Sequence, residues 1–572
     1  MDTQRLILFM LFTFSVFFLL DAWQKEANPP RAVPASSTPS SASPGSSTPV
    51  PTPTPAQSQA AAPARSVPPI GAGSADLQKG ETIRVETDTF LAEISTVGGD
   101  LRHLELRGHR DTLDKKKTFT LLQQQPTHTY IAQSGMIGND FPNHRTVYAA
   151  ADKDVKLAPG AASVAVRLTA QTPAGIKVVK SYTFRRDSYL IDVSYEVENK
   201  SAAPIQPDAY FQLVRDGTPP AGDSAMMPTY TGIAVYTDKE KFQKIAFTDV
   251  DKGKVNYPKK SSDGWIAILQ HYFLAAWLPA SNVAREFYTQ RLDNGLYTAG
   301  VIVPVGRIEP GATGTLAMPL YAGPEEQDNL SKLAPGLDLT IDYGWLTIIA
   351  KPLFWFLQWL YQWVHNWGVA IIILTVTLKA LFYPLSAASY RSMARMRVLA
   401  PRLQKLKDQY GNDRQRMNQA MMELYKTEKI NPLGGCLPVI VQIPVFIALY
   451  WVLLASVELR HAPFMWGIDD LSTAAITTGT ATTGGFDIAP FMYLVLPVLM
   501  GATMIFQTYL NPVPPDPVQA KIMKIMPIAF SVMFFFFPAG LVLYWLVNNV
   551  LSIAQQWQIT RAMEQVKPAH GR

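Results

Sequence analysis

The chain of 572 residues has one cysteine, Cys436, and eight histidines, none of which stands in an HExxH pattern. A single cysteine excludes an internal disulfide bond and a zinc site made of cysteine ligands. A glycine-rich loop ending in Lys-Ser or Lys-Thr, the mark of a nucleotide-binding site, is also missing from the sequence. The sequence therefore predicts no metal, no cofactor and no catalytic residue, and we expect a protein that is not an enzyme.

Charge is scarce as well. The formal net charge is +6, which gives no indication of a nucleic acid partner. Residues up to about 340 have the composition of a soluble protein, whereas apolar and aromatic runs dominate the rest. The mean hydropathy of +0.05 is thus an average over a polar first part and an apolar second part of the chain. We expect a lipid bilayer around the second part of the chain.

The first 75 residues contain one apolar run and one stretch that cannot fold. Residues 6–23 are apolar, and no small-x-small cleavage site follows them. This favours an uncleaved signal-anchor span at residues 1–24 over a cleaved signal peptide. Residues 25–75 are rich in Pro, Ser, Thr and Ala and hold almost no large apolar side chain, so we predict a disordered linker.

Residues 76–335 show the two-residue alternation of half-buried strands. Turn sequences such as Val97-Gly-Gly-Asp100 separate the strands, and no helices alternate with them. The pattern predicts a large antiparallel β-sandwich. Its clearest strands are residues 82–86, 90–94, 101–106, 176–184, 189–197, 264–269 and 297–303.

An alternative role for this sandwich is the chemistry of sugars, which needs a histidine and a carboxylate in a concave sheet. His103, His144 and Glu105 are the candidates. Their spacing in the sequence gives no reason to bring them together, and isolated histidines in strands are common. We therefore favour a sandwich without catalytic activity.

Residues 342–366 predict an amphipathic helix at the membrane surface. Trp355, Trp359, Trp363 and Trp367 recur every four residues and so share one helical face. Tryptophan prefers the boundary between lipid and water, and polar residues are interspersed here. We predict Trp355, Trp359 and Trp363 as interfacial anchors, with an ordinary buried helix as the alternative.

Beyond residue 366 lies a predicted core, residues 367–558, with five apolar runs near the length that crosses a bilayer. The segment after the first run, residues 386–431, is strongly basic and is therefore predicted to be cytoplasmic. With the anchor, six spans place both termini and the short tail 559–572 in the cytoplasm and the sandwich in the periplasm. The five runs are residues 367–385, 433–457, 491–510, 522–537 and 540–557.

The basic segment predicts a hairpin of two helices joined at Gly411-Asn412-Asp413, a stop followed by an N-cap. Methionines recur along both helices at helical spacing. They pack the helices together, and methionine also suits contacts with varied partners. We predict that this hairpin recruits substrates, and a ribosome or targeting factor, through Arg391, Arg395, Arg402, Met393, Met396, Met417 and Met421.

Lys379 lies in the first apolar run, four residues after Thr375 and so on the same face. A charge in a spanning helix costs roughly 2.5–3.5 kcal/mol at mid-helix, which makes it a candidate functional residue. Extension of the side chain to the headgroups is the alternative, because Pro384 is near. The five runs hold no Asp or Glu, which argues against a proton-coupled carrier. No serine on this run is placed for a Ser–Lys protease dyad.

Four motifs in the second part of the chain are long and specific: Asn431-Pro-Leu-Gly-Gly-Cys-Leu-Pro438, Gln442-Ile-Pro444, Ser456-Val-Glu-Leu-Arg460 and Pro538-Ala-Gly-Leu-Val-Leu-Tyr-Trp545. With them the sequence closely resembles the YidC/Oxa/Alb family of membrane protein insertases, in its Gram-negative YidC form. The resemblance implies a five-helix core around a hydrophilic groove that is closed towards the periplasm. Lys379 falls at the family's cation position, often an arginine, and the other implied groove residues are Thr375, Gln442, Trp545 and Asn548.

The resemblance also implies an activity: insertion and folding of nascent inner-membrane proteins, alone or with the Sec translocon, in the bacterial inner membrane. The alternative is a membrane-anchored chaperone or assembly scaffold that acts only downstream of Sec. The tail 559–572 is shorter than the basic tails with which relatives bind ribosomes, so we do not expect it to bind them.

Overall fold

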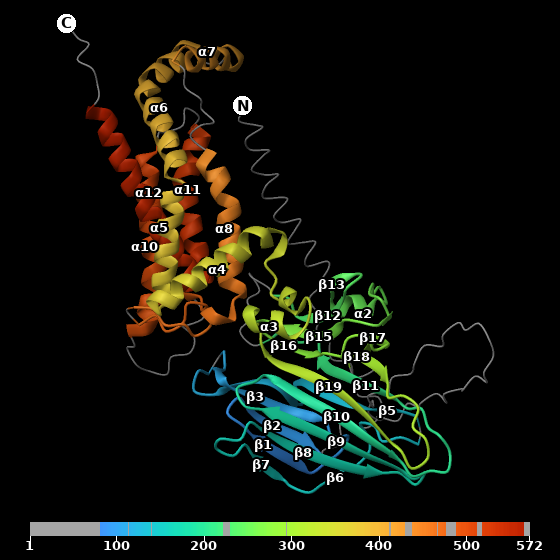
Figure 1. Cartoon of the computed structure of the whole chain (residues 1–572). Helices are drawn as coiled ribbons and strands as arrows, with labels where there is room; N and C mark the ends of the chain where they lie inside the picture. Colours follow the sequence, from blue (N-terminus) through green and yellow to red (C-terminus); the bar gives the residue numbers. More distant parts are fainter. Residues whose placement is uncertain are drawn as a thin grey trace, which may run out of the picture. The chain divides into compact units, whose positions relative to one another are not determined.

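The computed structural model describes residues 80–565, apart from residues 113, 139, 221–228, 293–294, 411–412, 429–436, 466, 476–487 and 512–516. The predicted anchor and linker, Cys436 and most of the motif 431–438 lie outside the described residues. The chain divides into two units, one within residues 30–341 and one within residues 342–572. Strands build the first unit and helices the second (Figure 1).

Two large sheets make up the β-rich unit. The strands of the first sheet are β1 (Thr82–Glu86), β2 (Phe90–Ser95), β3 (Leu101–Arg110), β4 (Thr118–Gln125), β5 (His128–Ile137), β7 (Asp154–Lys156), β11 (Asp208–Asp216), β14 (Lys260–Ser261), β17 (Arg285–Arg291) and β18 (Leu296–Pro304). Those of the second are β6 (Ala149–Ala150), β8 (Ser163–Gln171), β9 (Ile176–Arg185), β10 (Leu190–Asn199), β12 (Gly232–Thr237), β13 (Lys241–Ile245), β15 (Trp265–Gln270), β16 (Phe273–Trp277) and β19 (Thr313–Pro324). Short helices α2 (Phe247–Asp251), α3 (Gln327–Leu333) and η1 (Leu337–Thr340) complete the unit.

The first sheet has the strand order β14-β17-β18-β11-β5-β4-β3-β2-β1-β7, and the second β13-β12-β15-β16-β19-β10-β9-β8-β6. The named strand pairs of the described residues are antiparallel except β1 with β7. The predicted antiparallel architecture is thus confirmed. Strands β5, β11 and β12 were not predicted; most of their side chains are buried, so they lack the alternation of half-buried strands.

Aromatic side chains from both sheets meet in one core. The ring of Phe211 on β11 lies 5.2 Å from that of Trp277 on β16 and 5.8 Å from that of Tyr195 on β10. Phe90 on β2 packs edge-on against Phe184 on β9 at 6.1 Å. Each of these pairs joins the two sheets, so the layers share a dry interior of the kind found in β-sandwiches.

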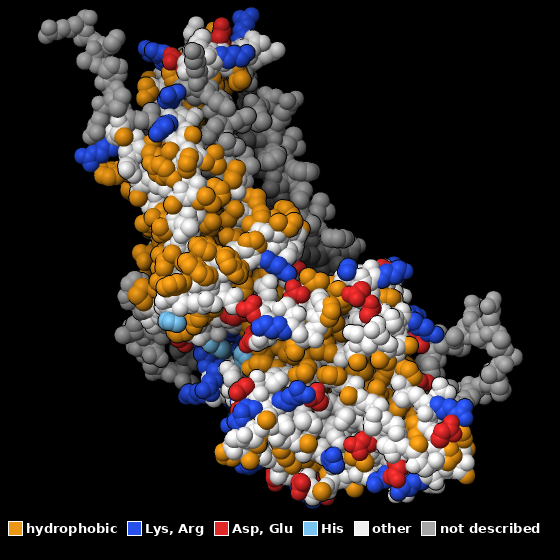
Figure 2. All heavy atoms as spheres, in the orientation of Figure 1, with side chains coloured by type: hydrophobic (Ala, Val, Ile, Leu, Met, Phe, Trp, Pro, Cys, Tyr) orange, Lys and Arg blue, Asp and Glu red, His pale blue; other side chains and the backbone are white. Residues whose placement is uncertain are grey.

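The helical unit contains α4 (Thr347–Val364), α5 (Trp367–Leu381), α6 (Tyr383–Tyr410), α7 (Arg414–Thr427), α8 (Leu437–Ala455), α10 (Ile488–Leu510), α11 (Pro517–Met533) and α12 (Ala539–Gln565), with the short turns η2 (Gly344–Leu346), η4 (Val457–Leu459) and η5 (Phe534–Phe536). Helix α12 packs against α5, α6 and α10, and α10 packs against α11. Hydrophobic side chains dominate the visible face of these helices, whereas charged side chains are spread over the β-rich unit (Figure 2).

Among the described helices, one apolar stretch is long enough to cross a bilayer by itself, Phe491–Leu510 in α10. Helix α5 and the first part of α6 pass the same test only as a pair, and they are bent by 65° where they meet. Pro384 lies in the first turn of α6, and its missing N–H prevents the hydrogen bond that would continue α5 into α6 as one helix. Helix α11 has 17 residues, or about 26 Å, slightly less than a bilayer core. The predicted number of six spans is therefore not established by the described helices.

The segment after α8 folds onto the start of α12. The backbone N–H groups of Gly540 and Ala539 donate to the carbonyls of Leu471 and Thr473, at 2.8 and 3.0 Å. Asp470 organises this segment: although burial disfavours its charge, hydrogen bonds from His461 and Ser472 hold the pKa of Asp470 well below its usual value. The chain leaves η5 through Phe537 and Pro538, and α12 extends from Ala539 past residue 558 into the predicted tail.

Candidate functional site

A pocket in the helical unit has Lys379 in its wall, and we call it the Lys379 pocket. Helix α5 with the residue after it, the first turn of α6, α8 and α12 supply its walls. The lining consists of Thr375, Leu378, Lys379, Phe382, Ser386, Gln442, Val445, Tyr544 and Asn548. Four of the five predicted groove residues, all except Trp545, therefore line one pocket.

Lys379 lies near the end of α5 and is buried, with 7% of its surface exposed. Its Nζ donates a hydrogen bond to Oγ of Ser552 on α12 at 2.7 Å. No carboxylate of the described residues forms an ion pair with it. The side chain is thus held inside the helical unit by a neutral group. Sequence reasoning missed Ser552, although it stands four residues after Asn548 and so on the same face of the helix.

Two further polar groups complete the pocket wall. Nε2 of Gln442 on α8 donates to Oδ1 of Asn548 on α12 at 2.6 Å. Thr375 is 1% exposed, and its hydroxyl donates to the carbonyl of Ile371 one turn earlier at 2.6 Å. The threonine hydroxyl proton is therefore occupied within α5, whereas the Gln442 and Asn548 side chains join two helices.

Other polar residues of α12 face away from this wall. Asn549 donates to Oγ1 of Thr503 on α10 at 3.4 Å, and Gln556 donates to the carbonyl of Leu510 at 3.0 Å. The two residues are seven apart and so share one face of the helix. They act as contacts between α12 and α10, which is the usual role of polar side chains in membrane helices.

Trp545 does not line the pocket. Its ring packs edge-on against that of Phe446 on α8 at 4.1 Å and lies tilted against that of Phe534 in η5 at 5.5 Å. The preceding residue, Tyr544, lines the pocket instead. The rotation of α12 thus directs Tyr544 towards the Lys379 pocket and Trp545 towards α8 and η5, and a groove role of Trp545 stays a prediction.

The predicted pair of helices is present as α6 and α7. Asp413 is the N-cap of α7 and accepts a hydrogen bond from the N–H of Arg416 at 3.1 Å. Arg402 pairs with Glu428 across the hairpin at 2.5 Å. The predicted arginines are exposed and the predicted methionines are partly buried, namely Arg391, Arg395, Arg402 and Met393, Met396, Met417, Met421. Each of these methionines therefore has one part of its side chain buried and another part exposed.

Helix α4 exposes a row of tryptophans. Trp355, Trp359 and Trp363 are 67%, 43% and 72% exposed, and the opposite face packs against α5 and α8. The prediction that Trp367 continues this row is wrong. Helix α4 ends at Val364, and Trp367 starts α5 with its ring buried and stacked on Tyr361 at 4.2 Å. The left-handed residue His365 between the helices breaks the four-residue spacing.

The candidate sugar-active residues fall into two separate sets of contacts. His103 and Glu105 are two apart on β3, and their side chains hydrogen-bond at 3.0 Å. His144 is 3% exposed and is bound to the hydroxyl of Tyr210 on β11. His144 with its tyrosine partner is a core residue, whereas His103 and Glu105 do contact each other, which their spacing in the sequence gave no reason to expect.

The two units together define a class: an α-helical membrane protein with a buried cation among apolar helices and a large additional β-sandwich. The chain belongs to the YidC family. Residues 82–356 match the family model described as YidC periplasmic domain, and residues 359–566 match that of the 60Kd inner membrane protein.

Relatives of high identity extend over the whole chain. Membrane protein insertase YidC of Nitrosospira multiformis is 54% identical, over 99% of this chain and 98% of the relative. The protein of the same name from Methylobacillus flagellatus is 54% identical, also over 99% and 98%. A solved structure described as an active YidC insertase aligns at 18% identity over 83% of this chain and 92% of that one, with a TM-score of 0.38.

Proposed function

We propose that this chain inserts nascent membrane proteins into the bacterial inner membrane, the activity that its relatives carry in their names. The observation that carries the proposal is the burial of Lys379 in a pocket wall, opposite a serine and without a carboxylate among the described residues. A buried cation without a resident counter-charge is suited to a carboxylate that arrives and leaves again.

The proposed mechanism needs positioning and no covalent chemistry. A polar, often acidic, segment of the substrate enters a hydrophilic groove of which the Lys379 pocket is part. Lys379, Gln442 and Asn548 then replace some of the water that the segment loses, which lowers the cost of moving it into the bilayer. The apolar segment leaves sideways into lipid, at roughly 25 cal/mol for each Å² of apolar surface removed from water. The chain acts as a carrier surface in this proposal and is not an enzyme.

The hairpin and α4 have supporting roles in this proposal. The exposed arginines of α6, such as Arg391 and Arg395, and the partly buried methionines receive the substrate, together with a ribosome or targeting factor. The exposed face of α4 holds the helix at the lipid–water boundary. We further propose six spans with both termini in the cytoplasm, and cooperation with the Sec translocon on larger substrates.

Reconstitution tests the activity directly. The full chain in liposomes is offered a small single-spanning substrate without Sec components, and protection of the translocated end from protease is measured. We expect insertion well above that of empty liposomes. Insertion that appears only when Sec components are added would favour the alternative of a chaperone downstream of Sec.

A charge series at position 379 tests the mechanism in cells depleted of their own insertase. Lys379→Arg should support growth, because the positive charge and its reach are kept. Lys379→Glu should abolish growth, since a carboxylate repels the acidic flank of a substrate, and Lys379→Ala should fall between the two. Equal growth of the Glu and Arg variants would show that the charge at this position has no role.

A further inference from the structure

We propose that Ser552 is a positioning residue for Lys379: its hydroxyl holds the ammonium in the pocket until a substrate carboxylate takes its place. The inference rests on the proposed function and adds to it a resident hydrogen-bond acceptor. Lys379 and Ser552 belong to α5 and α12, 173 positions apart in the chain, so their contact exists only in the folded helical unit.

The hydroxyl of Ser552 is oriented by its neighbours. Ser552 is 4% exposed, and its Oγ donates to the carbonyl of Asn548 at 2.7 Å. Because its single proton is used in this bond, its lone pairs are left to accept hydrogen bonds. One acceptor position receives Nζ of Lys379 at 2.7 Å. A serine in this arrangement is an acceptor for a cation and lacks a free proton for nucleophilic chemistry.

A neutral acceptor suits a cation that has to change partners. Lysine has a long flexible stem, and Lys379 stands two residues before the end of α5, so without an acceptor it extends towards the headgroups. A carboxylate at position 552 would also hold the ammonium, but a buried ion pair is hard to separate. The serine hydroxyl is a weaker partner than a carboxylate, and a substrate carboxylate can therefore displace it.

The same face of α12 carries a second contact. Asn548 stands one turn before Ser552, and its side chain accepts from Gln442 on α8 at 2.6 Å. Lys379 and Gln442, the polar residues that α5 and α8 bring to the pocket beside Thr375, are thus both bound by α12. Displacement of Ser552 from Lys379 leaves the contact of Asn548 with Gln442 in place, so Lys379 can change partners without separation of α8 from α12.

The matched variants Ser552→Asp and Ser552→Asn separate charge from size. Both are reconstituted as the full chain in liposomes with two substrates that differ only in an Asp or an Asn in the translocated flank. We expect Ser552→Asp to reduce insertion of the Asp substrate about tenfold relative to the Asn substrate, because it supplies Lys379 with a permanent counter-charge. Ser552→Asn should leave this ratio within about twofold of that of the unchanged chain.

A second pair of variants controls for the case in which Ser552→Asp or Ser552→Asn does not fold. Ser552→Thr keeps the hydroxyl and should retain the ratio, while Ser552→Ala should lower insertion of the Asp substrate only. Equal effects of Ser552→Asp on both substrates, or equal ratios for the Asp and Asn variants, would overturn the role of Ser552. Absence of insertion by the unchanged chain would instead refute the proposed function, so the two failures are distinguishable.

Discussion

Lys180 in the β-rich unit and Lys379 in the helical unit are both buried lysines, yet their surroundings differ. Lys180 on β9 is fully buried, and its Nζ donates to the carbonyls of Gly98 and Ser134 at 3.0 and 3.3 Å. The rings of Tyr182 and Tyr195 lie 5.4 and 5.6 Å from the same atom. Two carbonyls and two aromatic faces surround this ammonium, and none of these groups comes from outside the domain.

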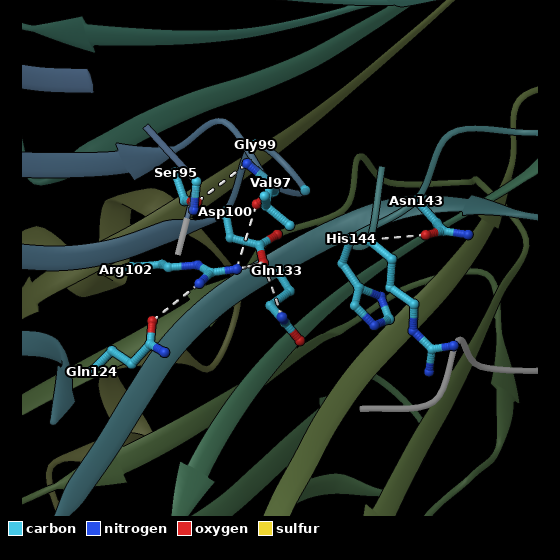
Figure 3. A network of polar contacts seen from close by, with 12 residues as sticks. Ser95, Val97, Gly99, Asp100, Arg102, Gln124, Gln133, Asn143 and His144 are labelled. Carbon is cyan, nitrogen blue, oxygen red and sulfur yellow. Dashed lines mark hydrogen bonds and ion pairs between the residues drawn. The ribbon is translucent and has the colours of Figure 1, made fainter. Parts of the chain in front are cut away.

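A carboxylate completes the surroundings of Lys180. Asp100 follows the turn at Gly98 and Gly99, and its Oδ2 accepts from Gln133 at 2.9 Å and from Arg102 at 3.4 Å (Figure 3). Burial raises the pKa of Asp100, and the charges of Lys180 and Arg102 oppose that rise. Burial likewise lowers the pKa of Lys180 to about 8, against the charge of Asp100. The cluster joins both sheets with groups that the fold itself supplies.

The comparison separates a structural charge from a working one. Lys180 has hydrogen-bond acceptors, aromatic faces and an acid nearby, so a further ligand has nothing to add. Lys379 has one serine hydroxyl among the described residues and stands in a pocket wall. Burial alone does not distinguish the two lysines, since both are less than a tenth exposed. The two lysines are distinguished by the number and the charge of the groups that surround each ammonium.

The largest effect on stability is expected from Lys180→Met. The variant removes two hydrogen bonds to backbone carbonyls and leaves Arg102 as the remaining cation beside Asp100. The removed cost of burying the ammonium offsets part of this loss, so the β-rich unit should be destabilised by about 1–3 kcal/mol. Pulse proteolysis of the full chain in detergent, over a series of urea concentrations, measures the loss.

The partly exposed Lys177, three residues earlier on the same strand, provides the control. Its ion pair with Glu198 spans 3.9 Å at the surface, so Lys177→Met should change the free energy of unfolding by less than about 0.5 kcal/mol. Equal stability of the two variants would mean that the buried cluster contributes no more than well-packed apolar side chains would, and the contrast with Lys379 would lose its basis.

A smaller effect is expected from pH. The unfolded chain keeps the Lys180 proton up to its usual pKa of about 10.5, whereas the folded unit loses it near 8, so the unfolded state binds more protons between these values. Stability of the β-rich unit should therefore rise with pH, by about 1.5 kcal/mol from pH 8 to 9.5. The window closes before pH 10, where the tyrosines of the unfolded chain ionise while burial holds the pKa of Tyr182 and Tyr195 well above 10 in the fold.

The variant Lys180→Met again provides the control for this dependence, because it lacks the titrating group and keeps the tyrosines. The urea midpoints of both proteins are measured at pH 7.5, 8.5 and 9.5. The difference between the two midpoints should stay constant up to about pH 8 and grow above it. Parallel midpoints over the whole range would contradict a depressed pKa at Lys180.

The sequence predicted elements better than it predicted partners. The strands at residues 82–86 and 176–184 were found within one residue because their alternation is regular. The glycines of Val97-Gly-Gly-Asp100 were recognised as a turn, and both have positive φ. The approach of Lys180 to that turn was not predicted, because it depends on how two sheets stack rather than on local pattern.

The same limit applies to the pocket. Lys379, Thr375, Gln442 and Asn548 were placed by their occurrence in apolar runs and by resemblance to a family, and all four line the pocket. Ser552 was missed because a serine in an apolar run is common and its partner lies on another helix. The rotation of α12, which separates Asn548 from Asn549 and Tyr544 from Trp545, is set by packing against α5, α8 and α10.

The smallest effect on stability is expected from Lys379→Met, although the same variant should lose insertion of acidic substrates. The change removes one hydrogen bond to Ser552, and hydrogen bonds between membrane helices contribute about 0.6 kcal/mol on average. Lys379→Met also no longer buries an ammonium, and this gain in stability offsets the loss of the hydrogen bond. The unfolding temperature in detergent should therefore stay within about 3 °C of that of the unchanged chain. Asn549→Ala, which removes a contact to α10 outside the pocket, should have a similar effect on stability and none on insertion. A large loss of stability in Lys379→Met would place Lys379 with Lys180 as a structural charge.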